Sequence, residues 1–452
     1  MEATIAAVAT ALGNGSISII RVSGTDAVSI VNGIFDGVDL TTVPTHTIHY
    51  GHIREGDTII DEVMVTVMRA PRTYTREDVV EINGHGGILV TKRVLQALFD
   101  AGVREAEPGE FTKRAFLNGR IDLAQAESVM DLIQAKNQMA ITNSLNQLSG
   151  RTTEKIRVLR EKILSEIAYI EAALDDPEYY EMSSYGERIR EDIAAIEARL
   201  AAMIRQAENG EMMRDGITTA IVGLPNAGKS SLLNYLANRE RAIVTDIAGT
   251  TRDTIEERIL MDDIVLNMVD TAGIRDTTDA VERIGVRRSL ESIERAQLIL
   301  YVIDTSVPLT PDNDIIFDAI GDKKTIILLN KTDCQNSEVV NELPSAFEHV
   351  IHTSLTEETG LEALKDCIRE IVYEGSVEPD EDLYVANERQ RRLLIAARDA
   401  VQRVLDTIDE GFAEDFLSID LTEAYASLGK ILGEEIEEDI INKIFKDFCM
   451  GK

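Results

Sequence analysis

Cysteine is scarce in this chain: its 452 residues include only Cys334, Cys367 and Cys449. Three cysteines so far apart do not form the disulfide framework of a small secreted domain, which favours a reducing, cytoplasmic location. Long apolar runs are missing as well, and the start, MEATIAAVATALGNG, lacks the basic region of a signal peptide. We therefore expect no contact with a membrane.

Basic residues are few relative to acidic ones, with 46 lysines and arginines against 80 aspartates and glutamates and a net charge of -34. Such an excess repels nucleic acid at long range. We therefore do not expect the surface as a whole to bind RNA through contacts with its phosphates. An RNA substrate would need a local basic patch or a basic partner protein. The length predicts two or three domains.

The hydrophobic pattern divides the chain into four segments and predicts a multidomain α/β plus all-α protein. Residues 1–118 carry short β-branched runs and one helical stretch, which is typical of a small α/β domain. Apolar residues recur at spacings of three and four through 119–213 and 378–452, which predicts a helical domain in two halves. Between them, 214–377 alternates apolar strands with helices and predicts an inserted domain with a buried, mainly parallel sheet.

A phosphate-binding loop of the form GxxxxGKS opens this inserted domain, at Gly223-Leu-Pro-Asn-Ala-Gly-Lys-Ser230. Gly223 and Gly228 let backbone N–H groups approach phosphate oxygens, and the following helix adds its positive end. Lys229 would reach the β- and γ-phosphates, and Ser230 would offer its hydroxyl to Mg²⁺.

Two further motifs specify guanine. Asp270-Thr-Ala-Gly273 follows a strand, where Asp270 can hold a Mg²⁺-bound water and the Gly273 N–H can meet the γ-phosphate. In Asn330-Lys-Thr-Asp333 the carboxylate of Asp333 can accept hydrogen bonds from guanine N1–H and its exocyclic amine, a donor pair that adenine lacks. A backbone N–H of Ser354-Leu-Thr356 would meet the guanine O6. The three motifs together predict GTP binding.

Hydrolysis requires another group, because Ile274 stands where Ras-like GTPases have a water-orienting glutamine. Glu282 could orient the water, although a solvated carboxylate at a helix start explains the same spacing. The polar segment Thr245–Asp253 has the composition of a switch loop, and one of its threonines should close on Mg²⁺.

Several motifs spread over the chain resemble the MnmE (TrmE) family of tRNA-modification GTPases. They are GLPNAGKSSLLN, AGTTRDT, DTAGIR followed by VERIG, EINGHGG, FLNGRIDLAQAE and the terminal FCMGK. The resemblance implies a Ras-like G domain, an N-terminal folate-binding and dimerisation domain, and a homodimer. It also implies an FAD-containing MnmG-type partner in a heterotetramer. Together they would form the 5-carboxymethylaminomethyl or aminomethyl group on the wobble uridine of certain tRNAs, which would be held mainly through the complex.

The family likeness also implies the ligands of two metal ions and the role of Glu282. A K⁺ ion would take the place of an arginine finger, Mg²⁺ would bind Ser230 and Thr251, and Glu282 would orient the attacking water. The K⁺ ligands would be Asn226, Thr245, Ile247 and Thr250. The GTP contacts as a whole would be Asn226, Ala227, Gly228, Lys229, Ser230, Ser231, Thr245, Asp246, Ile247, Ala248, Gly249, Thr250, Thr251, Asp270, Thr271, Ala272, Gly273, Asn330, Lys331, Asp333, Ser354, Leu355 and Thr356.

The same likeness implies a site for a reduced folate, either 5-formyl- or methylene-tetrahydrofolate, formed by Arg21, Glu81, Arg120 and Lys452. Cationic groups suit the glutamate carboxylates of folate, and a carboxylate suits the donor face of the pterin. The family often has lysine where this chain has Arg120, which keeps the charge but changes its geometry. Cys449 could be a catalytic nucleophile beside the folate or a buried cysteine at a helix end, whereas Cys334 and Cys367 are expected to be packing residues.

Two other classes of GTPase remain as alternatives. A ribosome-assembly or RNA-binding switch GTPase should carry a basic RNA-binding module such as a KH segment, and no such segment is visible. A regulatory GTPase of membranes or protein partners fits the acidic surface, but a membrane protein of this kind should have an amphipathic anchor, and none is visible.

Overall fold

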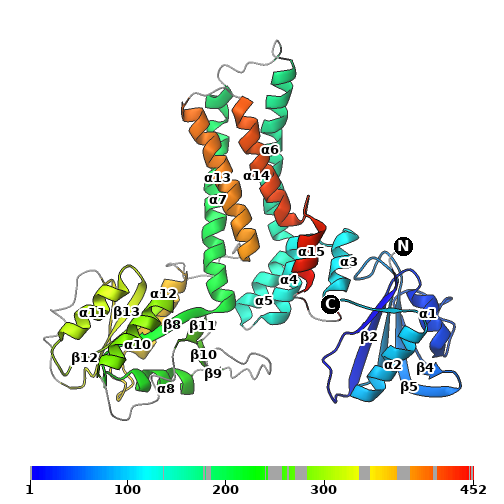
Figure 1. Cartoon of the computed structure of the whole chain (residues 1–452), viewed down its shortest axis with the longest axis horizontal. Coiled ribbons are helices and arrows are strands. Elements are labelled where there is room, and N and C mark those ends of the chain that lie inside the picture. The colour runs from blue at the N-terminus through cyan, green and yellow to red at the C-terminus, as the bar shows by residue number, and fades with distance from the viewer. Residues whose placement is uncertain are drawn as a thin grey trace. The chain divides into compact units, whose positions relative to one another are not determined.

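The computed structural model describes thirteen stretches of the chain, and they form two compact units (Figure 1). Unit 1 comprises Met1–Ile133, Leu145–Glu197 and Leu393–Lys452, and unit 2 comprises Gln134–Ser144 and Ala198–Arg392. The chain therefore leaves unit 1, builds most of unit 2 and returns. This confirms the predicted multidomain α/β plus helical fold class with an inserted domain, whereas the four predicted boundaries stay predictions. The described residues are 3–135, 137–176, 179, 185–239, 241–242, 257–261, 264–269, 282–334, 347–373, 387–410, 415–446, 448 and 451.

Unit 1 begins with a seven-stranded sheet in the order β3-β4-β5-β6-β2-β1-β7. Neighbouring strands are antiparallel except β1 and β7, and the β2–β6 register places Arg21 opposite Glu81. Helices α1 (Ala27–Ile34) and α2 (Ile88–Asp100) pack Val31 and Leu98 onto one face of the sheet and complete its core. The strands are β1 Ile5–Val8, β2 Ile17–Ser23, β3 Phe35–Asp36, β4 Thr47–Glu55, β5 Thr58–Met68, β6 Val79–His85 and β7 Arg104–Glu105.

The helical part bears out the sequence periodicity. The buried apolar residues of α13 are 394, 397, 400, 401 and 404, and those of α14 are 417, 421, 424, 428, 431 and 432, which gives each helix one apolar stripe. The C-terminal helix α15 packs Phe445 against Phe116 and lies so close to Gly109 that a Cβ there would be 2.5 Å from the Phe445 carbonyl oxygen. The helices are α3 Glu110–Leu117, α4 Leu123–Gln134, α5 Gln138–Leu148, α6 Arg151–Asp175, α7 Tyr185–Asp215, α13 Glu388–Glu410, α14 Asp415–Leu432 and α15 Glu438–Lys446.

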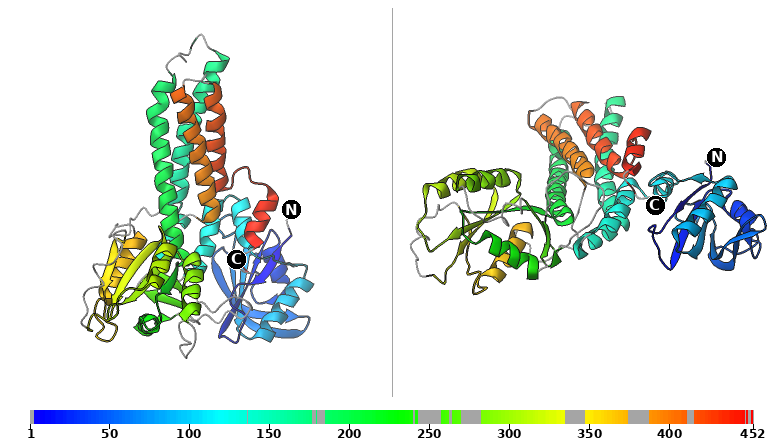
Figure 2. Two further views of the ribbon diagram at one scale, coloured as in Figure 1. Left: turned by 60° about the vertical axis from the view of Figure 1, so that its left-hand side comes forward. Right: turned by 60° about the horizontal axis from the view of Figure 1, so that its bottom comes forward.

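Unit 2 contains a second seven-stranded sheet, in the order β14-β13-β12-β8-β11-β10-β9. The five strands from β14 to β11 are parallel, and β10 and β9 extend the sheet in antiparallel fashion. Helices α8 and α12 cover one face and α10 and α11 the other (Figure 2). The elements are β8 Ile217–Val222, α8 Lys229–Arg239, β9 Arg241–Ala242, β10 Glu257–Met261, β11 Ile264–Met268, α10 Glu282–Arg295, β12 Leu298–Asp304, α11 Pro311–Ile320, β13 Lys324–Asn330, β14 His349–His352 and α12 Leu361–Tyr373.

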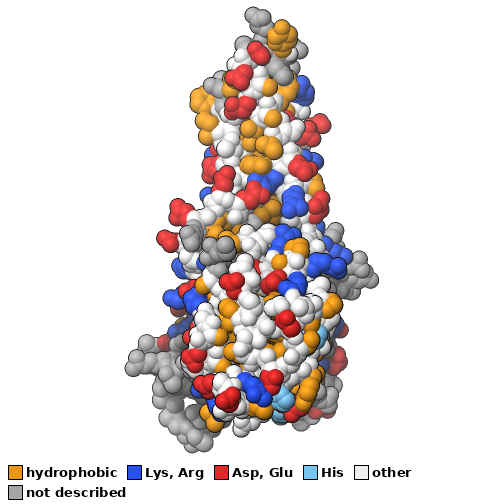
Figure 3. All heavy atoms as spheres, turned by 90° about the vertical axis from the view of Figure 1, so that its right-hand side faces the viewer, with side chains coloured by type: hydrophobic (Ala, Val, Ile, Leu, Met, Phe, Trp, Pro, Cys, Tyr) orange, Lys and Arg blue, Asp and Glu red, His pale blue; other side chains and the backbone are white. Residues whose placement is uncertain are grey.

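Charge is spread over the surface. On the face drawn in Figure 3, acidic side chains (red) are scattered with basic ones (blue) between them. None of the described helices is both long and apolar enough to cross a bilayer.

Candidate functional site

The phosphate-binding loop lies between the end of β8 and the start of α8, as its sequence predicts. Gly223 has φ +149°, and a Cβ there would lie 2.3 Å from the carbonyl oxygen of Val302 on the neighbouring strand β12. Asn226 and Gly228 also adopt positive φ, at 64° and 112°. The loop therefore folds back tightly over the strand ends, and its glycines are required where the backbone passes closest.

Lys229, the first residue of α8, turns back over the loop. Its Nζ donates to the carbonyl oxygens of Gly223 and Leu224, each at 2.8 Å. Burial lowers the pKa of Lys229 to about 8, because a buried ammonium loses hydration. A phosphate at this position would place a negative charge beside the buried Lys229 ammonium.

Asn330 joins three of the predicted segments through one side chain. It ends β13, is 2% exposed, and its Nδ2 donates to the Ala227 carbonyl oxygen in the phosphate loop at 2.7 Å. Its Oδ1 accepts from the Leu355 N–H at 3.3 Å. Gly228 leaves the room for this amide, since a Cβ there would be 2.2 Å from Asn330 Nδ2. The phosphate-binding and base-recognition segments are thus held in one arrangement.

Asp333 is oriented by Ser354, a contact that the sequence did not predict. The Ser354 hydroxyl donates to Asp333 Oδ1 at 2.7 Å and lowers the pKa of that carboxyl. An ionised carboxylate is the acceptor that the guanine donors require. In the Ser354–Thr356 segment, the N–H of Ser354 is bonded to Thr359 and that of Leu355 to Asn330. Among the described residues, the N–H of Thr356 has no hydrogen-bond partner, so it is the N–H of this segment that could meet the guanine O6.

Lys331 is paired with Asp304, a residue that the motif search missed. Its Nζ lies 2.5 Å from Asp304 Oδ2 at the end of β12. Burial by itself would raise the pKa of Asp304, but its hydrogen bonds from Lys331 and Ser306 outweigh that effect and lower it. The sequence did contain a signal for this pair, since Asp304 ends a predicted strand of the parallel sheet. The pair fixes Lys331, whose φ of 65° turns the chain toward the base site.

Two cysteines were expected to be packing residues, and one is not. Cys367 is half-buried against the unit 2 core. Cys334 is exposed, with its Sγ 3.6 Å from Asp333 Oδ2. The expectation for Cys334 was wrong because this residue follows the base-recognition motif on an open loop.

The remaining nucleotide positions divide into three groups. Ser230 and Ser231 lie in the first turn of α8. Asn226 is exposed, and its amide has no hydrogen-bond partner among the described residues, so its carbonyl oxygen could serve a hard cation. Glu282 begins α10, but its side chain lies outside the described residues, as do Thr245, Asp246, Ile247, Ala248, Gly249, Thr250, Thr251, Asp270, Thr271, Ala272 and Gly273.

The structure brings Arg21, Glu81 and Arg120 together around Tyr74 in unit 1. Arg21 Nε lies 2.8 Å from Glu81 Oε1, and its Nη1 donates to the Gly451 carbonyl oxygen at 3.2 Å. The Arg120 guanidinium lies 4.7 Å from the centre of the Tyr74 ring and donates to the Tyr74 carbonyl oxygen at 3.0 Å. Tyr74 was not predicted. Lys452 and Cys449 lie outside the described residues, although Gly451 shows that the C-terminal segment reaches this cluster.

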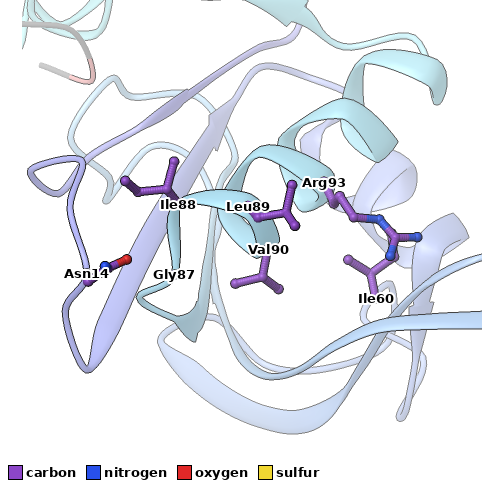
Figure 4. Close-up of a pocket in the computed structure, with 7 residues that line it drawn as sticks. All are labelled: Asn14, Ile60, Gly87, Ile88, Leu89, Val90 and Arg93. Carbon is purple, nitrogen blue, oxygen red and sulfur yellow. The ribbon is translucent and has the colours of Figure 1, made fainter.

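A separate groove lies beside the start of α2 (Figure 4). Its walls are apolar, with Arg93 at one side. It contains none of the predicted folate residues. The lining residues are Asn14, Ile60, Gly87, Ile88, Leu89, Val90 and Arg93.

Known proteins match this chain over almost its whole length. Residues 4–120 match the family described as the GTP-binding protein TrmE N-terminus, and residues 123–449 match the MnmE helical domain. The chain is 48% identical to the tRNA modification GTPase MnmE of Lachnoclostridium phytofermentans over 456 residues and 49% identical to that of Bacillus anthracis over 455. Each match covers 99% of both chains. A solved G domain of the T. maritima FeoB iron transporter matches 34% of this chain and 97% of its own at 23% identity, with a TM-score of 0.24.

Proposed function

The chain belongs to the MnmE family of tRNA modification GTPases and is a GTPase. From that premise we propose that its GTP hydrolysis is stimulated by K⁺ and serves modification of the wobble uridine of certain tRNAs. The Asn330 side chain supports the nucleotide part of the proposal, since it joins the phosphate loop to the segment expected to meet guanine. The family match supports the tRNA part. With Asp333 oriented by Ser354, these residues would recognise the base next to the loop that would receive the phosphates.

The phosphate loop offers groups that fit both proposed metal ions. Ser230 would supply a hydroxyl to Mg²⁺, with Thr251 as the second protein ligand, and Asn226 would supply its amide oxygen to K⁺ with Thr245, Ile247 and Thr250. Bound K⁺ and Mg²⁺ would offset the negative charge that develops on the phosphates. Lys229 would bind the β- and γ-phosphates, and Glu282 would orient the attacking water.

We propose that the cluster around Tyr74 binds a reduced folate, 5-formyl- or methylene-tetrahydrofolate, with Lys452 completing it. Two cations, one carboxylate and an aromatic ring form a site suited to a pterin joined to a carboxylate-bearing tail. Cys449 would reach the same region because Gly451 contacts Arg21, which keeps its nucleophilic role open to test. Calorimetry of the full-length protein with 5-formyltetrahydrofolate tests the site, and an absence of binding would refute it.

The proposed assembly is a cytoplasmic homodimer that joins an FAD-containing MnmG-type partner in a heterotetramer and contacts tRNA mainly through that complex. The family match supports this reading over a ribosome-assembly or RNA-binding switch GTPase. The net charge of -34 supports it as well, since a basic partner would do most of the holding of RNA.

The experiment for the GTPase mechanism compares steady-state hydrolysis in KCl and NaCl at equal ionic strength. We expect faster hydrolysis in KCl, loss of that advantage in Asn226→Ala, and a fall of roughly 100-fold in Glu282→Ala. Asn234→Ala, an exposed asparagine on α8, is the matched control and should keep the KCl advantage. Equal rates in both salts for the unaltered protein would refute the role of K⁺, and an unchanged Glu282→Ala rate would refute that of Glu282.

A further inference from the structure

Three arginines at the edge of the Tyr74 cluster have no carboxylate partner. Arg72, Arg76 and Arg120 are exposed, and in the described part of the chain no carboxylate oxygen lies within 4.0 Å of their guanidinium groups. The nearest acids along the chain are engaged elsewhere: Glu77 binds Arg114 at 3.1 Å, and Asp78 accepts from the Ala70 N–H at 2.9 Å. In a chain with 80 acidic and 46 basic residues, unpaired cations at one place point to an anionic ligand.

Two hydrogen bonds hold this basic loop against the segment that carries Arg120. Asn118 Nδ2 donates to the Thr75 carbonyl oxygen at 2.6 Å, and Arg76 Nη1 donates to the Asn118 carbonyl oxygen at 3.0 Å. Arg120 follows two residues later and bonds to Tyr74. Arg76 and Arg120 are therefore carried on two segments that are hydrogen-bonded to one another rather than on independent loops.

The cluster also has a direction. Glu81 pairs with Arg21, whose guanidinium lies 5.8 Å from the centre of the Tyr74 ring, whereas Arg120 lies 4.7 Å from it and has no carboxylate partner among the described residues. A carboxylate suits the hydrogen-bond donors of a pterin, and an unpaired guanidinium suits a carboxylate. A folate placed accordingly has its pterin near Glu81 and its glutamate near Arg120. Arg72 and Arg76, two residues before and after Tyr74 in the chain, are the exposed cations nearest to this position in the loop.

From this arrangement we propose that Arg72 and Arg76 bind the γ-linked polyglutamate tail of the folate, so that the preferred ligand is a folylpolyglutamate. The inference rests on the proposed folate site and specifies its ligand. Each added glutamate carries one more carboxylate, and each can meet a guanidinium that has no carboxylate partner among the described residues. The pterin end is unaffected, so Arg72 and Arg76 should change the preference for the tail and not the binding of the rest of the molecule.

The test measures the affinity of the full-length protein for 5-formyltetrahydrofolate with one glutamate and with five, by calorimetry at low and physiological salt. We expect roughly tenfold tighter binding of the pentaglutamate, with the preference reduced by salt because the arginines are exposed. In Arg72→Gln/Arg76→Gln the two ligands should bind equally, with the monoglutamate affinity unchanged. Lys92→Gln/Arg93→Gln on α2 removes the same charge and should keep the preference.

The experiment distinguishes failure of the tail assignment from failure of the folate site. If the monoglutamate binds but the unaltered protein shows no preference, or if Arg72→Gln/Arg76→Gln keeps it, the tail assignment is overturned and the folate site stands. If neither folate binds, the folate site itself is refuted. Loss of tRNA affinity in the double variant without any change in folate preference would also overturn the proposal and would assign the loop to RNA.

Discussion

The Ser354 hydroxyl is the residue-scale feature with the most direct effect on nucleotide choice. It donates to Asp333 and keeps the carboxylate ionised and aimed. We predict that Ser354→Ala lowers GTP affinity about tenfold, since a hydrogen bond to a charged group is lost. Ser354→Thr keeps the hydroxyl and should stay close to the unaltered protein. Fluorescent GDP titration measures both, and a Ser354→Ala affinity within twofold of the parent would contradict the role.

Lys229 gives nucleotide binding a pH dependence. Its pKa in the free loop is about 8, and bound phosphate raises that value because it stabilises the ammonium. Between the two values the complex holds more protons than the free protein, so binding takes up protons and affinity falls as pH rises above 8.

Calorimetry of GDP binding in two buffers of different ionisation enthalpy measures this uptake. We expect the uptake of a fraction of a proton that is larger at pH 8.5 than at pH 7.5. Lys229→Arg stays charged and should show no such increase. An uptake that does not grow between the two pH values would contradict the prediction.

At the residue scale, the sequence predicted several residues of the base-recognition segments but not the side chains that orient them. Asn330, Asp333 and Ser354 were predicted from motif spacing and lie together. Asp304 and Tyr74 were missed, because their roles depend on which strand or loop lies beside them and not on local spacing. Parallel neighbours such as β12 and β13 are far apart in the chain, and a side chain pairing across them has no sequence period.

At the scale of elements, a histidine–carboxylate pair joins the ends of β5 and β6. His85 Nδ1 lies 2.7 Å from Asp61 Oδ1, and Asp61 Oδ2 accepts from the His85 N–H at 2.9 Å. The hydrogen bond and charge of Asp61 raise the pKa of His85. The pair therefore stabilises the fold fully below the unfolded-state pKa of about 6.5, and this contribution is lost as pH rises through the folded value.

Titration of the His85 ring protons by NMR tests the pair. We predict a pKa above about 6.5 in the unaltered protein and a return toward that value in Asp61→Asn. Glu62→Gln should shift it less, since Glu62 is the smallest of the causes. A His85 pKa at or below the ordinary value would show that the pair does not form.

Elements were predicted best where one period dominated. Strands β8, β11, β12 and β13 are mostly apolar and buried, and α13 and α14 repeat at three and four. The short strands β3, β7 and β9 have two residues each and carry no period. Their position depends on pairing with longer strands, as β9 pairs with β10. Sheet edges of this kind follow from tertiary contacts rather than from local pattern.

For the whole molecule, the insertion of unit 2 between parts of unit 1 places the GTPase and the proposed folate cluster in separate compact units. The chain ends belong to the same unit, and the C-terminal segment reaches the N-terminal sheet through Gly451. The expected GTP residues and the proposed folate residues therefore belong to different units and share no residue. The family descriptions do not follow this division, because the one that matches residues 123–449 spans parts of both units.

The net charge of -34 leads to a prediction about RNA at this scale. Long-range repulsion should keep the isolated protein from binding tRNA more tightly than about 10⁻⁶ M at physiological salt. Addition of the FAD-containing partner should give a tight complex whose affinity falls steeply with salt, because the partner supplies the phosphate contacts. Filter binding of labelled tRNA to each protein and to the mixture measures this. Submicromolar binding by the isolated chain would contradict the prediction, and it would mean that a local basic surface overcomes the overall charge.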